Sequence, residues 1–321
     1  MKIFSFIRNF INSYRDGVTF FEGVALLPVL GFLISFYYGA GMVYIHRIDH
    51  DTGFSSAHPT QGGSATVDIM AALIGREVLT NHWPANDPPF MPGFALDNMP
   101  NYQMGIIYAL GRFSVQLSDQ LGRARGSSQV DRDLDMAVGL LKYPGTVWVF
   151  NFDTSVLPTA SSESQYIRAR EALLSYNRRV AGGQAVFDRR ADNLISALDA
   201  IAADLGSQSA VIDDHIAASK HVFLDTKADD IFYATKGRVY AYYLILRELK
   251  KDYAQIIEAR DIGSVWTNML ESFRETAEME PLVVVSGAPD SQFLPSHLAS
   301  QGFYLLRART QLREISNILT K

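Results

Sequence analysis

The longest feature of the hydrophobic pattern is an uncharged run of 23 residues, from Gly23 to Ile45. An α-helix rises about 1.5 Å per residue, so this run can cross a hydrocarbon layer of roughly 30 Å. A buried core helix, the competing interpretation, is usually shorter and less uniformly apolar. Pro28 and the glycines are tolerated in membrane spans, and Tyr44 fits an aromatic anchor at the membrane surface. The pattern therefore predicts one transmembrane helix over 23–45.

A cleaved signal peptide is the second interpretation of this run. Signal peptides have a shorter apolar region, followed by a small-x-small cleavage site. The best candidate site ends at Ala40, but Tyr38 stands where a small residue is needed. An uncleaved anchor is therefore favoured.

The flanking charges predict the orientation of this helix. Lys2, Arg8 and Arg15 precede it, whereas Arg47 follows it and the next Lys or Arg is Arg76. Because the more basic flank stays inside, residues 1–22 are expected in the cytoplasm and the remaining chain outside it.

Beyond the anchor the pattern becomes helical. Residues 46–64 are rich in Gly, Ser and Thr and predict a linker. Apolar positions then recur every three or four residues through most of 65–321, most regularly over 187–205 and 225–260. Two β-prone runs, 146–152 and 281–287, are candidates for a single short pair. The predicted fold is all-α or α-dominated: one N-terminal transmembrane helix plus a bundle-like extracytoplasmic domain with at most a short β pair.

A proline-rich segment, Asn81–Asn101, interrupts this pattern with five prolines, several aromatic rings and several carboxamides. Proline blocks both helices and central strands, and long irregular loops are often functional. An equally good interpretation is that the segment laces two helices together and buries its own rings. If the chain has a binding site, we expect it here, formed by Trp83, Asp87, Phe90, Phe94, Asp97 and Tyr102.

Composition limits the classes of function. Residues 46–321 carry 26 Lys and Arg against 32 Asp and Glu, so the predicted domain is acidic and no nucleic-acid partner is expected. The chain has no cysteine, which excludes disulfides, thiolate metal sites and a cysteine nucleophile. His46 and His50 would share a face if they were helical, but a polar collar explains them without a metal. No H-E-x-x-H, G-x-S-x-G or Walker-type motif is present, and we predict no catalytic residue, metal or cofactor.

A peptidoglycan-acting hydrolase or lyase is the alternative function. Such enzymes use paired acids or one acid in an apolar pocket, and the candidates are Glu77, Asp87 and Asp97. Neighbouring rings such as Trp83 and Tyr102 could stack on sugars. An enzyme would need an open cleft with a desolvated acid, whereas an interaction surface would need exposed rings.

Several stretches resemble the DUF2333 family of bacterial proteins, a domain of unknown function. They are YIHRID (44–49), NDPPFMPGFALDNMPN (86–101), RGSSQVD (125–131) and LPSHLASQGFYLLRARTQLREI (294–315). The resemblance implies a bacterial envelope protein with one span and brings no reaction with it. We therefore expect a single-pass inner-membrane protein whose periplasmic helical domain is a scaffold or accessory interaction subunit. An envelope protein is its expected partner, and a homo-oligomer is compatible with the sequence.

Overall fold

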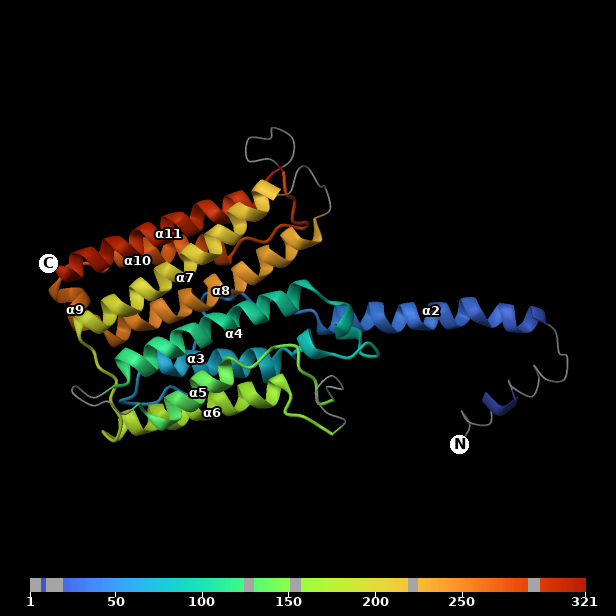
Figure 1. Ribbon diagram of the computed structural model, residues 1–321, viewed down its shortest axis with the longest axis horizontal. Coiled ribbons are helices and arrows are strands. Elements are labelled where there is room, and N and C mark those ends of the chain that lie inside the picture. The colour runs from blue at the N-terminus through green and yellow to red at the C-terminus, as the bar shows by residue number, and fades with distance from the viewer. Residues whose placement is uncertain (1–6, 10–19, 124–129, 151–156, 219–224, 288–294) are drawn as a thin grey trace.

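A computed structural model describes residues 7–9, 20–123, 130–150, 157–218, 225–287 and 295–321 (Figure 1). One long helix projects from a bundle of helices that run roughly along the same axis. The helices are α2 (Phe20–Ile45), α3 (Ala65–Gly75), α4 (Asn98–Gln116), α5 (Arg132–Leu141), α6 (Ser162–Ala181), α7 (Ala191–Ala218), α8 (Thr226–Asp252), α9 (Ala254–Ala259), α10 (Gly263–Ala277) and α11 (His297–Thr320). The described residues contain no strand, so the α-dominated fold predicted from the pattern is confirmed.

Side chains immediately before several helices explain where those helices begin. Ser64 Oγ accepts from Val67 N at 3.3 Å, and Asp225 Oδ1 accepts from Ala228 N at 3.0 Å. Ser161 and Ser296 cap α6 and α11 in the same way. Each cap satisfies a backbone N–H that has no partner inside its helix.

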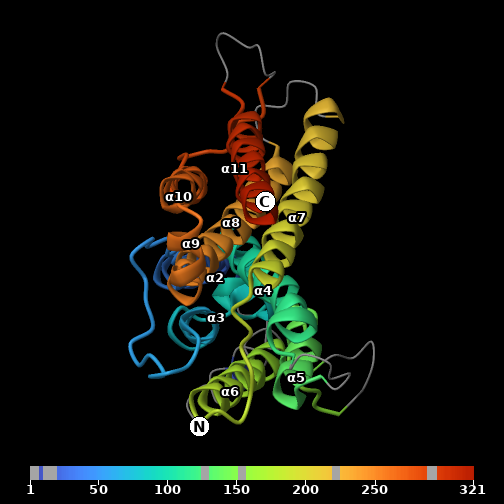
Figure 2. The ribbon, with the colours of Figure 1, turned by 90° about the vertical axis from the view of Figure 1, so that its left-hand side faces the viewer.

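The helices form successive layers when the bundle is viewed along its axis (Figure 2). α5 and α6 pack on each other at one edge and rest on α4 and α3, respectively. α4 and α3 pack in turn on α8, which lies between them and the pair α10 and α11. The core is continuous through these layers, and α4 with α8 forms its central pair.

Short helical turns of two kinds supplement these elements. π-helical turns, Arg76–Thr80 and Leu117–Leu121, extend the C-terminal ends of α3 and α4. 3₁₀ turns, Pro84–Asn86 and Pro92–Ala95, lie inside the proline-rich segment.

The two β-prone runs do not pair with each other in the described part of the chain. Val149 O accepts from Thr159 N at 2.7 Å, and Val147 O accepts from Ser162 N at 3.0 Å. Ser286 instead forms an isolated antiparallel bridge with Ser296. Each run therefore pairs with a segment that follows shortly after it in the sequence, and not with the other run.

α2 is the one helix in the described residues whose length and composition could span a membrane. Its candidate membrane span, Leu27–Ile45, has none of its residues buried against the body. A soluble core helix of similar composition would be mostly covered. Most of the predicted cytoplasmic segment, 1–22, lies outside the described residues.

Candidate functional site

The proline-rich segment contacts α2. Tyr37 Oη donates to Phe90 O at 3.0 Å, and Tyr38 Oη donates to Pro89 O. One turn further along, the Gly41 backbone lies directly against the Pro92 ring, with no room for a side chain at Gly41. The last turns of α2 are therefore docked on this segment (Figure 1).

Residues 49–54, which we call the strap, connect α2 to the body and are held by α4 and α8. Tyr102 Oη donates to Asp49 O at 2.8 Å, and Tyr240 Oη donates to Asp51 O at 2.7 Å. Arg247 donates from its two terminal nitrogens to Thr52 O and Phe54 O, at 2.7 and 2.6 Å. The first part of the predicted linker is thus bonded to the bundle through its backbone carbonyls.

Beneath the strap lies a buried ion pair. Arg76 donates to Glu77 Oε1 at 2.8 Å, to Tyr240 Oη at 2.8 Å and to Asp49 O at 2.8 Å. The side chain of Glu77 is 0% exposed, and its Oε2 accepts from Gln103 Nε2 at 3.1 Å. Burial raises the pKa of Glu77, and the neighbouring Arg76 opposes that change. The carboxyl of Glu77 is sealed inside the body, where no substrate can reach it.

Two of the six predicted site residues are core residues. Trp83 is 1% exposed, donates from Nε1 to Gly145 O at 2.8 Å, and meets the Tyr166 ring edge-on at 5.2 Å. Tyr102 is fully buried and holds the strap. The Trp83 ring therefore fixes the segment to the bundle, and the Tyr102 ring fixes the strap.

Two other predicted residues point outward. Phe90 is 61% exposed and Phe94 is 56% exposed. The Phe90 ring meets Trp148 edge-on at 5.7 Å, and Trp148 lies 5.5 Å from Phe150. We call these four residues, Phe90, Phe94, Trp148 and Phe150, the aromatic face. It adjoins the last turns of α2.

The two predicted acids have separate surroundings. The side chain of Asp87 is almost covered, with Oδ2 3.3 Å from His82 Nε2, and this hydrogen bond raises the pKa of His82. Asp97 is exposed and accepts from Asn98 N at 2.8 Å at the start of α4. Burial, then Asp97 and then Asp230, raise the pKa of Asp229 to about 6. Asp87 therefore pairs with His82, and Asp97 caps α4.

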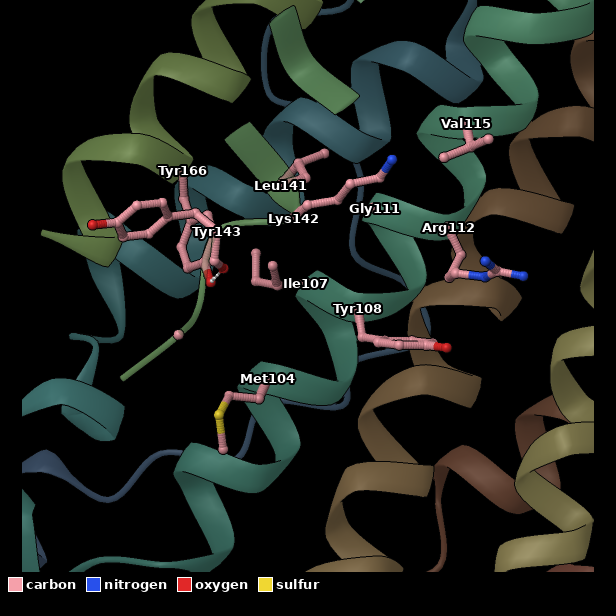
Figure 3. Close-up of a pocket in the computed structure, with 11 residues that line it drawn as sticks. Met104, Ile107, Tyr108, Gly111, Arg112, Val115, Leu141, Lys142, Tyr143 and Tyr166 are labelled. Carbon is pink, nitrogen blue, oxygen red and sulfur yellow. Dashed lines mark hydrogen bonds between the residues drawn. The ribbon is translucent and has the colours of Figure 1, made fainter. Parts of the chain in front are cut away.

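A groove of about 440 Å³ lies between α4 and the end of α5 (Figure 3). In Figure 3, Tyr143 and Tyr166 stand at one end of it, and Arg112 and Val115 at the other. Tyr166 Oη donates to Tyr143 O at 2.8 Å, which fixes the first end. The lining is mostly apolar and consists of Met104, Ile107, Tyr108, Gly111, Arg112, Val115, Leu141, Lys142, Tyr143, Gly145 and Tyr166.

The charges in the lining of this groove are cationic. The Arg112 side chain is half exposed, and its Nε lies 3.6 Å from the buried Asp204 Oδ1. Lys142 is exposed, and Arg238 lies over the Tyr108 ring with Cζ 3.9 Å from the ring centre. The groove thus combines an apolar floor with positive groups on an acidic protein.

The sequence interpretation did not single out these groove residues. The helical spacing identified the buried face of α4, but Tyr108 and Arg112 lie beside that face. The sequence of α4 does not indicate that the chain after α5 leaves Tyr108 and Arg112 uncovered. The signal lies in Tyr143-Pro144-Gly145, which ends α5 and turns the chain toward Trp83.

Histidines and carboxylates do not gather into a metal site within the described ranges. No group of three or more His, Cys, Asp or Glu lies close enough there to hold an ion. α2 ends at Ile45, so His46 and His50 are not on a helix and do not share a helical face. His50 Nε2 instead lies 3.8 Å from Glu280 Oε2.

The fold and this region define an α-helical bundle that carries one uncovered apolar helix and a proline-rich segment docked against it. The chain belongs to the DUF2333 family, described as an uncharacterized protein conserved in bacteria, whose family model matches residues 53–228. That range contains two of the motifs on which the resemblance rests, 86–101 and 125–131. No curated protein and no solved structure matches the chain.

Proposed function

We propose that this protein is a single-pass anchored scaffold or accessory interaction subunit of the bacterial inner membrane. In this proposal residues 1–22 are cytoplasmic, α2 crosses the membrane and the helical body is periplasmic. Three observations support it: the uncovered apolar α2, the basic residues before α2, and membership of a family conserved in bacteria.

The docking of α2 is the observation that carries the scaffold role. An enzyme needs only a flexible tether to stay near a membrane. Here the Tyr37 and Tyr38 hydroxyls, the Gly41–Pro92 contact and the strap join anchor and body at successive points. Such a joint holds the body at one height and orientation, which suits a protein that presents a surface to a partner.

The groove between α4 and α5 is the surface we propose for that partner. Its apolar floor, with Arg112 and Lys142 in its lining, matches a protein segment that carries an apolar side chain next to an acidic one. The positive charge of the groove distinguishes it from the rest of the body, which is acidic. We therefore propose an envelope protein with an acidic amphipathic helix as the partner, and we leave a homo-oligomer as an outcome of the test.

The surroundings of the acids disfavour the hydrolase or lyase alternative. A general acid must reach the bond it protonates. Glu77 is sealed by Arg76 and Gln103, Asp87 is covered beside His82, and Asp97 caps α4. None of the three lines the groove.

Photo-crosslinking in native membranes tests the proposal. A photoreactive phenylalanine replaces Tyr108, which is exposed in the groove, and captured proteins are recovered through a C-terminal tag. Lys142→Glu and Val115→Ser are then introduced to weaken the groove. Lys227→Glu is the control for charge, and Phe303→Ser on α11 is the control for an exposed apolar side chain.

We expect one stoichiometric envelope partner, lost in both groove variants and kept in both controls. Capture of the chain itself would replace the hetero-partner with a homo-oligomer. Equal capture by all variants would exclude the groove, and capture of nothing would contradict the interaction role.

A further inference from the structure

We propose that the aromatic face is a lipid-binding surface, which inserts into the bilayer leaflet nearest the body beside the end of α2. The inference rests on the proposed membrane anchoring and adds a second membrane contact to it. Its partner is a fluid bilayer, recognised through apolar contact with acyl chains and the glycerol region.

The length of α2 sets the depth of the proline-rich segment. A helical span needs roughly 20 residues, and 20 residues counted from Gly23, the first after Glu22, end at Met42. Tyr37, Tyr38 and Gly41 lie inside this stretch, and they are the residues that contact Phe90, Pro89 and Pro92. The segment is therefore level with the outermost turns of the span.

The opposite arrangement, with the segment wholly in water, leaves too little helix. If Tyr37 marked the membrane surface, only Gly23 to Phe36 would remain in the hydrocarbon. These 14 residues span about 21 Å, well short of a layer of roughly 30 Å. The mismatch is removed when the contacting segment enters the leaflet with α2.

The composition of the segment suits that depth. Nine consecutive residues, Pro88 to Leu96, carry no charge, and Asp87 and Asp97 stand immediately outside them. Trp148 and Phe150, which extend the aromatic face, come from a second uncharged stretch, 143–150. Aromatic rings, above all Trp, concentrate at the boundary between headgroups and hydrocarbon.

Several backbone polar groups of the segment are hydrogen-bonded, as an apolar environment requires. Unpaired peptide groups are costly in a membrane, so irregular chain is tolerated there only where its polar groups are satisfied. Pro88, Pro89 and Pro92 have no N–H to satisfy. The N–H groups of Met91, Phe94 and Leu96 each donate to the carbonyl three residues earlier, at 2.8, 3.2 and 3.0 Å. The carbonyls of Pro89 and Phe90 accept from the hydroxyls of Tyr38 and Tyr37.

A depth measurement on the full-length protein tests the proposal. Because the chain has no cysteine, Phe90→Cys and Phe94→Cys each give one site for a fluorescent label. The labelled protein is reconstituted in vesicles of phosphatidylethanolamine and phosphatidylglycerol, with and without lipids that carry a quenching spin label high on the acyl chain. Phe36→Cys in α2 is the control for the anchor, and Phe303→Cys on α11 is the control for exposure to water.

Labels at positions 90 and 94 should be quenched to within about twofold of the label at position 36, while the label at position 303 stays at the level of a water-soluble dye. Because Phe90 and Phe94 are exposed, circular dichroism should show unchanged helix content.

Quenching at 36 without quenching at 90 and 94 would overturn the lipid surface and leave the anchor intact. Shielding of 90 and 94 from aqueous quenchers, with no quenching by lipid, would overturn it in favour of contact between copies of the chain. Absence of quenching at 36 would overturn the anchor, and this inference with it.

Discussion

Gly105 of α4 and Gly237 of α8 lie where the two central helices make backbone contact. A Cβ atom on Gly105 would overlap Ala234 O, and one on Gly237 would overlap Tyr102 O. The helices can approach this closely only because neither position has a side chain. The contact matters beyond the core, because α4 supplies Tyr102 to the strap and most of the floor of the groove.

Replacing either glycine by alanine should therefore destabilise the protein. We expect a loss of about 2 kcal/mol in the free energy of unfolding, as for an overpacked core. The loss should appear in denaturant titrations followed by circular dichroism. Gly139→Ala in α5, where a Cβ meets nothing within 4 Å, is the control and should be neutral or stabilising. Equal effects at all three glycines would contradict the close crossing.

Truncation should destabilise the protein strongly at Trp83 and hardly at Phe94, although both residues belong to the same segment. Trp83→Ala removes a buried ring and its hydrogen bond to Gly145 O, so we expect a loss of about 3–5 kcal/mol. Phe94→Ala removes an exposed ring and should change stability by less than about 0.5 kcal/mol. Thermal unfolding of the two variants side by side measures the difference. If Trp83→Ala unfolded like the wild type, Trp83 could not be a core residue.

The buried pair of Arg76 and Glu77 should behave as a unit. Arg76→Met leaves a carboxyl buried without its cation and removes one of the two donors to the carbonyl of Asp49, for a loss of about 3–5 kcal/mol. Adding Glu77→Gln should recover much of that loss, because no buried charge then remains. A double-mutant cycle from urea titrations measures the coupling. Additive effects would show that the two side chains do not depend on each other.

Ionisation of Asp229 should lower the free energy of unfolding as the pH rises. Its pKa, raised to about 6 by burial and by Asp97 and Asp230, lies above the value of about 4 expected in the unfolded chain. Between these values the folded state binds more protons, so this contribution to stability is complete below about pH 4 and is lost as the pH rises through 6.

Asp229→Asn should therefore stabilise the protein at pH 7 by about 1 kcal/mol, after allowance for solvent screening of a half-buried group, and have little effect at pH 4. Urea titrations at both pH values measure the difference. Asp199→Asn on the exposed side of α7 is the control for the loss of one charge. The same gain at both pH values would rule out titration of Asp229 as the cause.

The candidate site was predicted only in part. The sequence drew attention to the proline-rich segment because five prolines and several rings had to be accommodated without a regular helix. The sequence could not show which of those rings are buried and which are exposed. Trp83, for example, is covered by Gly145 and Tyr166, which lie far along the chain. The Gly, Ser and Thr content of 46–64 predicted a linker. That composition does not indicate that Arg247 and Tyr240 bind the backbone carbonyls of the strap.

What the sequence determined by itself is what depends on neighbours along the chain. The uncharged run after Glu22 and the spacing of apolar residues in α7 and α8 specify the α-dominated fold, because helical period is a local property. The tertiary structure alone decided that α2 docks on Pro89, Phe90 and Pro92, that Glu77 is sealed, and that a groove remains open between α4 and α5. These features depend on which segments distant in sequence come together, and a single residue's chemistry does not specify its distant neighbours.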